Sequence, residues 1–141
     1  MATKVSITGA ESIEIGEKII TEMGFKVITP EDSNARSTDV SKIFWFKGRI
    51  IPQIGGTEGE PVSKLHQWSM VKTGVGVYRA VTAEYQADSN TVRRYNFPKA
   101  YVLDYDETFS DLEGTGTFYM EICEKKDENS KVTVEGGFAA E

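Results

Sequence analysis

Alternation of apolar and polar residues is the main pattern of this chain, and it predicts a fold built mainly of β-strands. Val5 and Ile7 alternate with polar residues, and the alternation returns in the segment IEI after the turn-like residues GAES. This pattern predicts two strands around a turn. A short helix over residues 11–23 is the competing prediction, because three apolar residues of that segment lie roughly on one helical face.

Two more strands are predicted in the first half of the chain. The segment FKVIT is a short predicted strand that ends before Pro30, and the polar segment PEDSNARSTD predicts a long exposed loop over residues 30–40. The segment VSKIFWFKGRIIP is rich in β-branched and aromatic residues, which favour strands.

One segment departs from alternation and predicts a helix over residues 61–73. Within EPVSKLHQWSMVKTG, apolar Val62, Leu65 and Trp68 recur at three-residue spacing, and Pro61 suits the first turn. Because the predicted helix is short and amphipathic, we expect one of its faces to pack onto a sheet.

The second half of the chain returns to alternation. Its predicted strands are GVGVYRAVTAEYQ, VRRYNFPKAYVLDYDETF, TFYMEICEKK and KVTVEGGF, and Arg79 interrupts an otherwise apolar face of the first. Pro98 cannot donate to a strand ladder, so it indicates an edge, a bulge or a break between two strand segments. Strands separated by turns every ten or so residues predict an antiparallel β-sandwich or barrel with one short flanking helix. Residues 136–141 are predicted to form a mobile tail.

Length and composition fit a folded protein. The 141 residues predict a single domain over residues 1–141, with 39% hydrophobic and 27% charged residues. No apolar run is long enough to cross a bilayer, and the N-terminus lacks the pattern of a secretory signal, which predicts synthesis in the cytoplasm. A single cysteine, Cys123, and a single histidine, His66, exclude an internal disulfide and most soft-metal sites.

The charge of the chain argues against nucleic-acid binding. Its formal net charge is −6, and an acidic protein repels phosphate backbones. Arg93 and Arg94 stand among aromatic residues, as in proteins that bind single-stranded nucleic acid. Adjacent residues of a strand point to opposite faces, however, so the two arginines do not form one basic patch.

Candidate catalytic and metal-binding residues are few. The densest group of carboxylates lacks the spacing of a calcium-binding loop, and we interpret it as the solvated end of a strand. This group consists of Asp104, Asp106, Glu107, Asp111 and Glu113. The glycine segments IGGTEGE and EGTGTF do not match a phosphate-binding loop, and no G-x-S-x-G element is present. We therefore predict a protein that is not an enzyme and binds neither a metal nor a cofactor.

The order of elements over residues 55–125 resembles the tube protein superfamily. This superfamily comprises Hcp of type VI secretion, phage tail tube proteins and the inner tubes of phage-tail-like particles. The resemblance is carried by the helix EPVSKLHQWSMVKTG, the strand GVGVYRAVTAEYQ and the pair VRRYNFPKAYVLDYDET and GTGTFYMEICEKK. The strand YNFPKAYVLDYDETF is similar to the family's "Y…LENA…I" strand, although FPKAYV stands in place of LENA.

The resemblance implies a β-sandwich or barrel with a flanking helix and a structural role without catalysis. It also implies self-assembly into six-fold rings that stack as the inner tube of a virion tail or of an extracellular or secretion particle. Its partners would be further copies of the chain and sheath, baseplate or cargo proteins. The residues that we expect to pair subunits are Phe44, Phe46, Val75, Val77 and Tyr78, with the loop residues Asn34 and Arg36.

A second hypothesis from a different class stays open at this point. A small β-sandwich could instead be a binding module for carbohydrate or for another protein, with exposed aromatic rings as its stacking surface. Core packing is the alternative role for each of these rings. They belong to Trp45, Trp68, Tyr101 and Tyr105.

Overall fold

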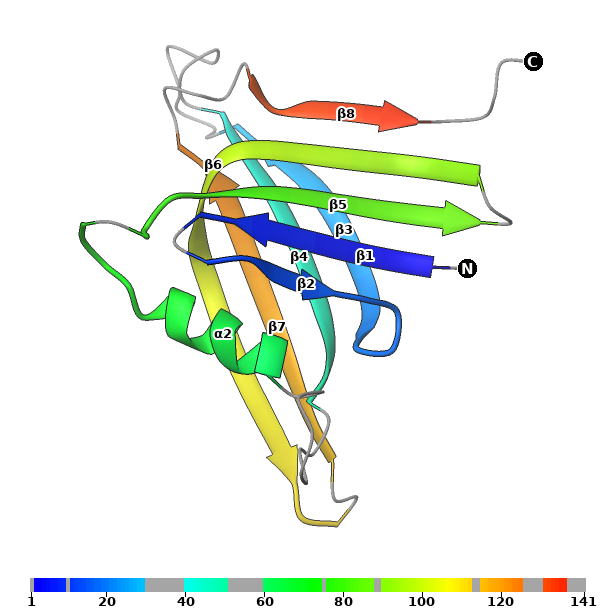
Figure 1. Ribbon diagram of the computed structural model, residues 1–141, viewed down its shortest axis with the longest axis vertical. Helices are drawn as coiled ribbons and strands as arrows, with labels where there is room; N and C mark the ends of the chain where they lie inside the picture. The colour runs from blue at the N-terminus through cyan, green and yellow to red at the C-terminus, as the bar shows by residue number, and fades with distance from the viewer. Residues whose placement is uncertain are drawn as a thin grey trace.

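The computed structural model describes residues 2–9, 11–29, 40–50, 60–74, 76–87, 90–112, 115–125 and 131–136. Its elements, in chain order, are β1 Ala2–Thr8, β2 Ile13–Ile15, β3 Ile20–Ile28, β4 Ser41–Ile50, α2 Glu60–Ser69, β5 Arg79–Ala87, β6 Asn90–Ser110, β7 Thr115–Glu124 and β8 Thr133–Gly136 (Figure 1). The predicted class, mainly antiparallel β with one short helix, is confirmed for the described residues. The helix predicted over residues 11–23 is wrong, because β2 and β3 occupy that segment.

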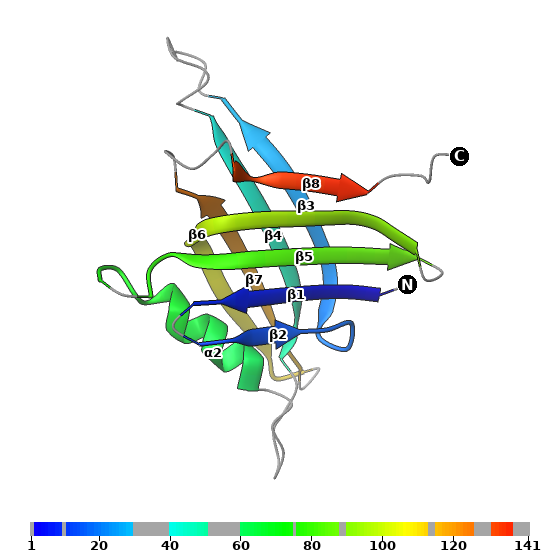
Figure 2. The same ribbon diagram turned by 45° about the horizontal axis from the view of Figure 1, so that its top comes forward.

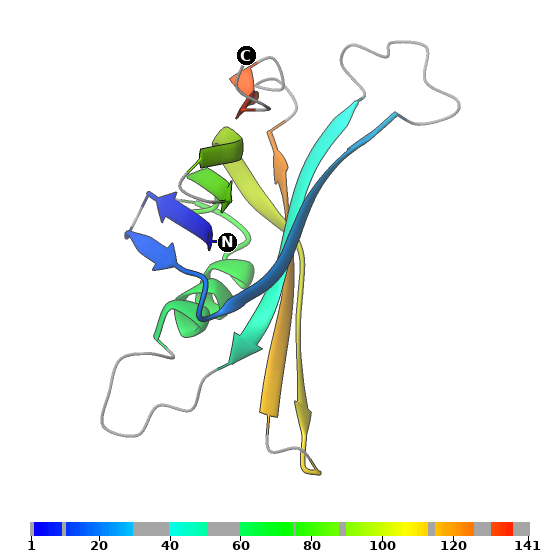
Figure 3. The same cartoon turned by 90° about the vertical axis from the view of Figure 1, so that its right-hand side faces the viewer.

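The strands form one antiparallel sheet that folds into two crossing layers (Figures 2 and 3). The strand order is β2-β1-β5-β6-β7-β4-β3, and β8 pairs with the first half of β6. We call β2, β1, β5, β8 and the first half of β6 the front layer, and β3, β4, β7 and the second half of β6 the back layer. The sheet does not close into a barrel, because β2 and β3 end the path without pairing with each other.

The strand β6 belongs to both layers and changes partner at a bulge. It pairs with β5 up to Ala100 and with β7 from Ala100 onward. Between these partners Pro98 and Lys99 lie opposite a single residue of β5, so the bulge indicated by Pro98 is confirmed. The backbone N–H of Lys99 donates to both carboxylate oxygens of Glu124, at 3.1 and 3.0 Å. This fully buried carboxylate therefore stabilises the bend between the two layers.

The core lies between the two layers, and α2 covers one side of it. Residues of alternate parity supply the core from each strand, as the sequence pattern predicts. Val62, Leu65 and Trp68 supply the buried face of α2, which contacts β2 and β6 (Figure 3). The buried hydrophobic residues on strands include Val5, Ile7, Ile13, Ile15, Phe44, Phe46, Val81, Ala83, Phe97, Phe118, Met120 and Ile122.

The helix and the strand that follows it are shorter than their sequence patterns predict. The helix ends at Ser69 rather than at residue 73, and β5 begins at Arg79. The indole N–H of Trp68 in α2 donates to the carbonyl of Val77 at 3.0 Å. This hydrogen bond links the helix to the residues just before β5. Gly74 and Gly76 have φ of 86° and 97°, a conformation that glycine adopts most readily. The predicted loop at residues 30–39 and the tail at residues 137–141 lie outside the described residues.

Candidate assembly surfaces

The back layer has an unpaired strand edge on each side. Among the described residues, β3 pairs with β4 alone, and residues 101–110 of β6 pair with β7 alone. An unpaired strand edge presents rows of backbone N–H and C=O groups that can pair with a strand of another chain. These two edges are therefore the main candidate sites for assembly.

The directions of the two edge strands suit repeated copies of one chain. Neighbouring strands are antiparallel throughout the series β3-β4-β7-β6, so β3 and β6 run in opposite directions. If a second copy stands beside the first in the same orientation, its β3 lies antiparallel to β6 of the first. The antiparallel hydrogen-bond pattern can then continue from one copy to the next.

The outer face of the back layer is polar and its side chains are paired across strands. Lys26 of β3 forms an ion pair with Glu121 of β7 at 3.1 Å, and the Tyr119 hydroxyl donates to the same carboxylate oxygen at 2.6 Å. The ring of Trp45 stacks on Tyr119, with centroids 6.0 Å apart. These contacts hold β3, β4 and β7 together on the face that points away from the core.

The hydrogen bond between Tyr119 and Glu121 shifts the pKa of both groups. Burial, followed by the hydrogen bond to Glu121, raises the pKa of Tyr119 well above its ordinary value. The hydrogen bond from Tyr119, assisted by Lys26, lowers the pKa of Glu121. The neutral phenol and the ionised carboxylate are therefore the forms that this face favours.

We expect the Tyr119 hydroxyl to make folding stability depend on alkaline pH. Because the pKa of Tyr119 is raised on folding, its contribution is present below the unfolded-state pKa of about 10 and is lost as the pH rises through the folded-state value. In urea unfolding followed between about pH 9 and pH 12, the wild type should lose stability more steeply than Tyr119→Phe. Tyr85→Phe, a change in the front layer, is the control, and parallel curves for wild type and Tyr119→Phe would contradict the prediction.

His66 joins α2 to the second half of β6. Its Nδ1 lies 3.2 Å from Oε2 of Glu107, and the hydroxyl of Tyr105 donates to the same oxygen at 2.5 Å. The His66 and Tyr105 rings meet edge to face at 5.7 Å. The buried Cys123, by contrast, donates to the carbonyl of Glu124 on its own strand. The contacts of His66 therefore link α2 to β6, and His66 and Cys123 have different partners.

A groove lies between α2 and the end of β6, with a volume of about 460 Å³. It is lined by Ile50, Val62, Ser63, His66, Gln67, Met70, Glu107 and Phe109. Within the described part of the chain, no three His, Cys, Asp or Glu side chains are grouped so that they could hold a metal ion.

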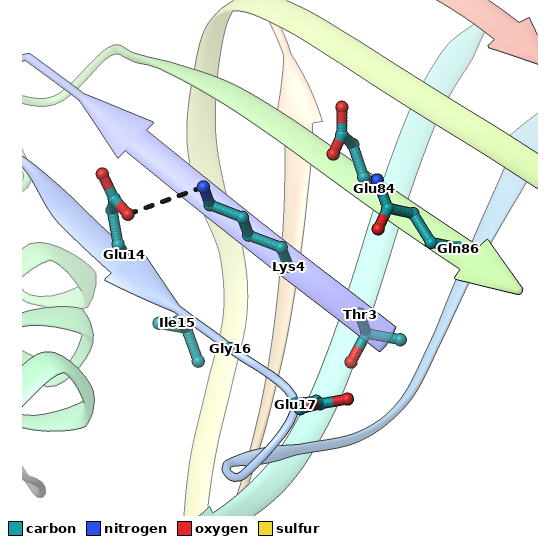
Figure 4. Close-up of a pocket in the computed structure, with 8 residues that line it drawn as sticks. All are labelled: Thr3, Lys4, Glu14, Ile15, Gly16, Glu17, Glu84 and Gln86. Carbon is teal, nitrogen blue, oxygen red and sulfur yellow. Dashed lines mark ion pairs between the residues drawn. The ribbon is translucent and has the colours of Figure 1, made fainter. Parts of the chain in front are cut away.

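A second pocket, of about 590 Å³, lies on the outer face of the front layer (Figure 4). Charges of alternating sign cross the strands there: Lys4 pairs with Glu14 at 3.7 Å, and Glu84 pairs with Arg94 at 2.6 Å. Such partly exposed pairs contribute roughly 0–1 kcal/mol each. The pocket is lined by Thr3, Lys4, Glu14, Ile15, Gly16, Glu17, Glu84 and Gln86. This face is thus polar and presents charges of both signs.

The same fold occurs in solved structures over nearly the whole chain, although no family model and no curated protein matches the sequence. Hcp1 from Flavobacterium johnsoniae is similar with a TM-score of 0.52 and 19% identity, over 95% of this chain and 96% of that one. A crystal structure of an Hcp protein has a TM-score of 0.56 and 11% identity, over 96% and 99% of the two chains.

This chain has the Hcp fold. The extended sheath–tube complex of PVC, an extracellular contractile injection system, also contains a similar chain, with a TM-score of 0.51 and 13% identity over 95% of this chain and 88% of that one. The resemblance predicted from residues 55–125 is confirmed at the level of the fold and extends beyond that segment. At these identities the likeness lies in the arrangement of strands and helix, and not in shared side chains.

The residues predicted to pair subunits fall into different environments. Phe44 and Phe46 are 0% exposed, because β4 lies between β3 and β7 and both rings point into the core. Their side chains are therefore used inside the subunit and offer no surface to a neighbour. Asn34, Arg36 and Val75 lie outside the described residues.

Tyr78 is the member of this set with an exposed side chain in the described residues. It is 45% exposed, its ring packs edge-on against Tyr101 at 6.0 Å, and the ammonium of Lys125 lies 5.5 Å from its centroid. Val77 beside it is half-buried. The sequence pattern does not indicate which strands have unpaired edges, because edge positions depend on which strands become neighbours.

The aromatic residues of the binding-module hypothesis are mostly engaged within the fold. Trp68 is 1% exposed, so core packing is confirmed for it. Tyr105 and Tyr101 are half-buried, and burial, followed by a hydrogen bond to Cys123, raises the pKa of Tyr101 to about 12. Trp45 is half-buried in its stack on Tyr119. Among the described residues, no helix has the length and apolar character that would let it span a membrane.

Proposed function

We propose that this chain is a structural subunit that assembles into rings, which stack as the inner tube of a phage-tail-like or secretion apparatus. The observation that carries the proposal is the pair of unpaired back-layer edges, β3 and the second half of β6, which run in opposite directions. A head-to-tail contact between these edges repeats from copy to copy and forms a ring where the rotation closes. The proposed role requires no catalytic group.

The solved structures with this fold support the number of subunits and the partners that we propose. One similar chain comes from the six-fold symmetrised baseplate of the anti-feeding prophage, with a TM-score of 0.53 and 8% identity. The PVC chain comes from a sheath–tube complex. By analogy, we propose a six-fold ring, with sheath and baseplate proteins as further partners and an extracellular or virion-like particle as the place of assembly.

The position of Leu103 on the β6 edge gives a direct test of ring formation. Leu103 is 46% exposed, and it lies at a register shift where it has no partner residue on β7. Leu103→Lys places a charge on the edge, and natural proteins use lysine in this way to keep strand edges from pairing. We expect the wild type to form rings in negative-stain micrographs, and the ring fraction of Leu103→Lys to fall by about tenfold or more.

Val134→Lys is the matched control for this change. Val134 of β8 is also an exposed apolar residue, at 48%, but β8 belongs to the front layer and pairs with the first half of β6, not with a back-layer strand. Size-exclusion chromatography with light scattering should show Val134→Lys assembling like the wild type, and circular dichroism should show all three proteins folded. A wild type that stays monomeric at high concentration, with no rings in micrographs, would rule out the proposed function.

A further inference from the structure

We propose that successive rings stack through an apolar contact between the two ends of the back layer. In this contact Phe109 and Leu112 of one copy lie against Val27 and Ile28 of a copy in the next ring. The inference rests on the proposed function, and it names the residues and the partner surface that join one ring to another.

The two residue pairs lie at opposite ends of the back layer. Ile28 ends β3 and lies opposite Ser41, the first residue of β4. Phe109 lies opposite Gly116 near the start of β7, and Leu112 follows in the turn after β6. Figure 1 shows the arrowhead of β6 at the bottom of the molecule and the far end of β3 at the top. Strands of about ten residues separate these ends by roughly 30 Å.

The exposure of these residues is high for large apolar side chains. Leu112 is 99% exposed and Phe109 67%, while Val27 and Ile28 are 53% and 45% exposed. Single exposed apolar residues are normal on a protein surface, but here large ones occur at both ends of the same layer. Val27 and Ile28 are adjacent in β3 and point to opposite faces of the sheet, so each supplies one side of that end. A contact in which the end of one layer meets the opposite end of the next would remove apolar side chains of both ends from water.

The geometry of the ring explains why the two ends would meet. If subunits pair along their β3 and β6 edges, the strands run across the height of the ring, with the tilt usual for barrels. The two ends of each back layer then lie on the two faces of the ring. The two faces of the ring therefore differ. When one face of each ring contacts the opposite face of the next ring, this head-to-tail contact repeats without closing and produces an open filament.

The charges at the two ends favour the same head-to-tail order. Asp106, Glu107 and Asp111 outnumber the one basic residue, Arg49, at or near the β6–β7 end of the described back layer, whereas Lys42 and Lys99 lie at the β3 end. These lysines also have interactions within their own subunit. Contact between unlike ends brings opposite charges together, while contact between two β6–β7 ends brings carboxylates together, which disfavours that arrangement.

A pair of complementary charges tests this contact. We expect Leu112→Asp and Ile28→Lys, made separately, to leave the rings intact and to lower the fraction of rings found in stacks by about tenfold or more. The double variant should regain stacking, because the two new charges have opposite signs. Leu112 is the better choice of the two tip residues for this change, since the ring of Phe109 also lies over Gly116. Val134→Asp, an equally drastic change in the front layer, is the control and should stack like the wild type.

Negative-stain micrographs report ring diameter and stack length separately, so the two proposals can fail independently. If the wild type forms no rings, the proposed function fails and this inference fails with it. If rings form and Leu112→Asp stacks like the wild type, or if Leu112→Asp loses the rings themselves, the stacking contact alone is overturned. If both single variants lose stacking and the double variant does not regain it, the pairing of these two ends is overturned.

Discussion

Trp68→Ala is expected to destabilise the protein by about 3–5 kcal/mol, the range measured for large aromatic residues removed from a core. Trp68 is 1% exposed and is the largest side chain on the buried face of α2. Its indole N–H donates to the carbonyl of Val77, and the guanidinium of Arg79 lies 5.2 Å from its ring centroid. The change therefore opens a cavity, removes a hydrogen bond and leaves a buried arginine without its aromatic neighbour. Such a loss is a large part of a typical domain stability of about 5–15 kcal/mol.

Trp68→Phe separates these contributions in urea unfolding, and Gln67→Ala is the control. Trp68→Phe keeps an aromatic ring but loses the N–H donor, so it should fall between the wild type and Trp68→Ala. Gln67→Ala changes an exposed neighbour on the same helix and should stay within about 0.5 kcal/mol of the wild type. A loss of less than about 1 kcal/mol for Trp68→Ala would show that α2 contributes little to the core.

The strands could be predicted from the sequence because alternation is a local property. Val5, Ile7 and the residues around them show their buried face within a few positions, and the structure places them as that pattern predicts. The crossing of the two layers could not be predicted in this way. It depends on β6 changing its partner from β5 to β7, and on the carboxylate of Glu124, which comes from a strand 25 residues further along the chain than Lys99.

The candidate assembly surface was harder to predict than the fold. Phe44 and Phe46 stand in the most strand-like segment of the chain, but the same apolar character that predicts a strand also suits a central strand with buried side chains. An edge strand is defined by the absence of a neighbour on one side. That property belongs to the order of strands in the sheet, which local sequence patterns do not contain.

Gly48→Ala is expected to destabilise the protein by about 3 kcal/mol, at the upper end of the range for overpacking. The role of Gly48 depends on the packing of β4 against the segment before β3, which the local sequence does not show. Gly48 lies in β4 opposite Ile20, the first residue of β3, where the chain arrives from β2 of the front layer. A β-carbon at this position would overlap the carbonyl oxygen of Ile19 and lie 2.9 Å from its carbonyl carbon. The Ile19 oxygen accepts a hydrogen bond from the Arg49 N–H at 2.9 Å, so the backbone cannot move away without losing that bond.

Other glycines of the chain provide graded controls for this prediction. A β-carbon on Gly24 would lie 2.5 Å from the side chain of Trp45, which can shift, so Gly24→Ala should cost about 1 kcal/mol. Gly16 has no atom within 4 Å of the added carbon, so Gly16→Ala should stay within about 0.5 kcal/mol of the wild type. Urea unfolding of the three variants checks the order. If Gly48→Ala is as stable as Gly16→Ala, the connection from β2 to β3 can move further from β4 without loss of stability. The close approach of Ile19 to Gly48 would then not be needed to join the two layers.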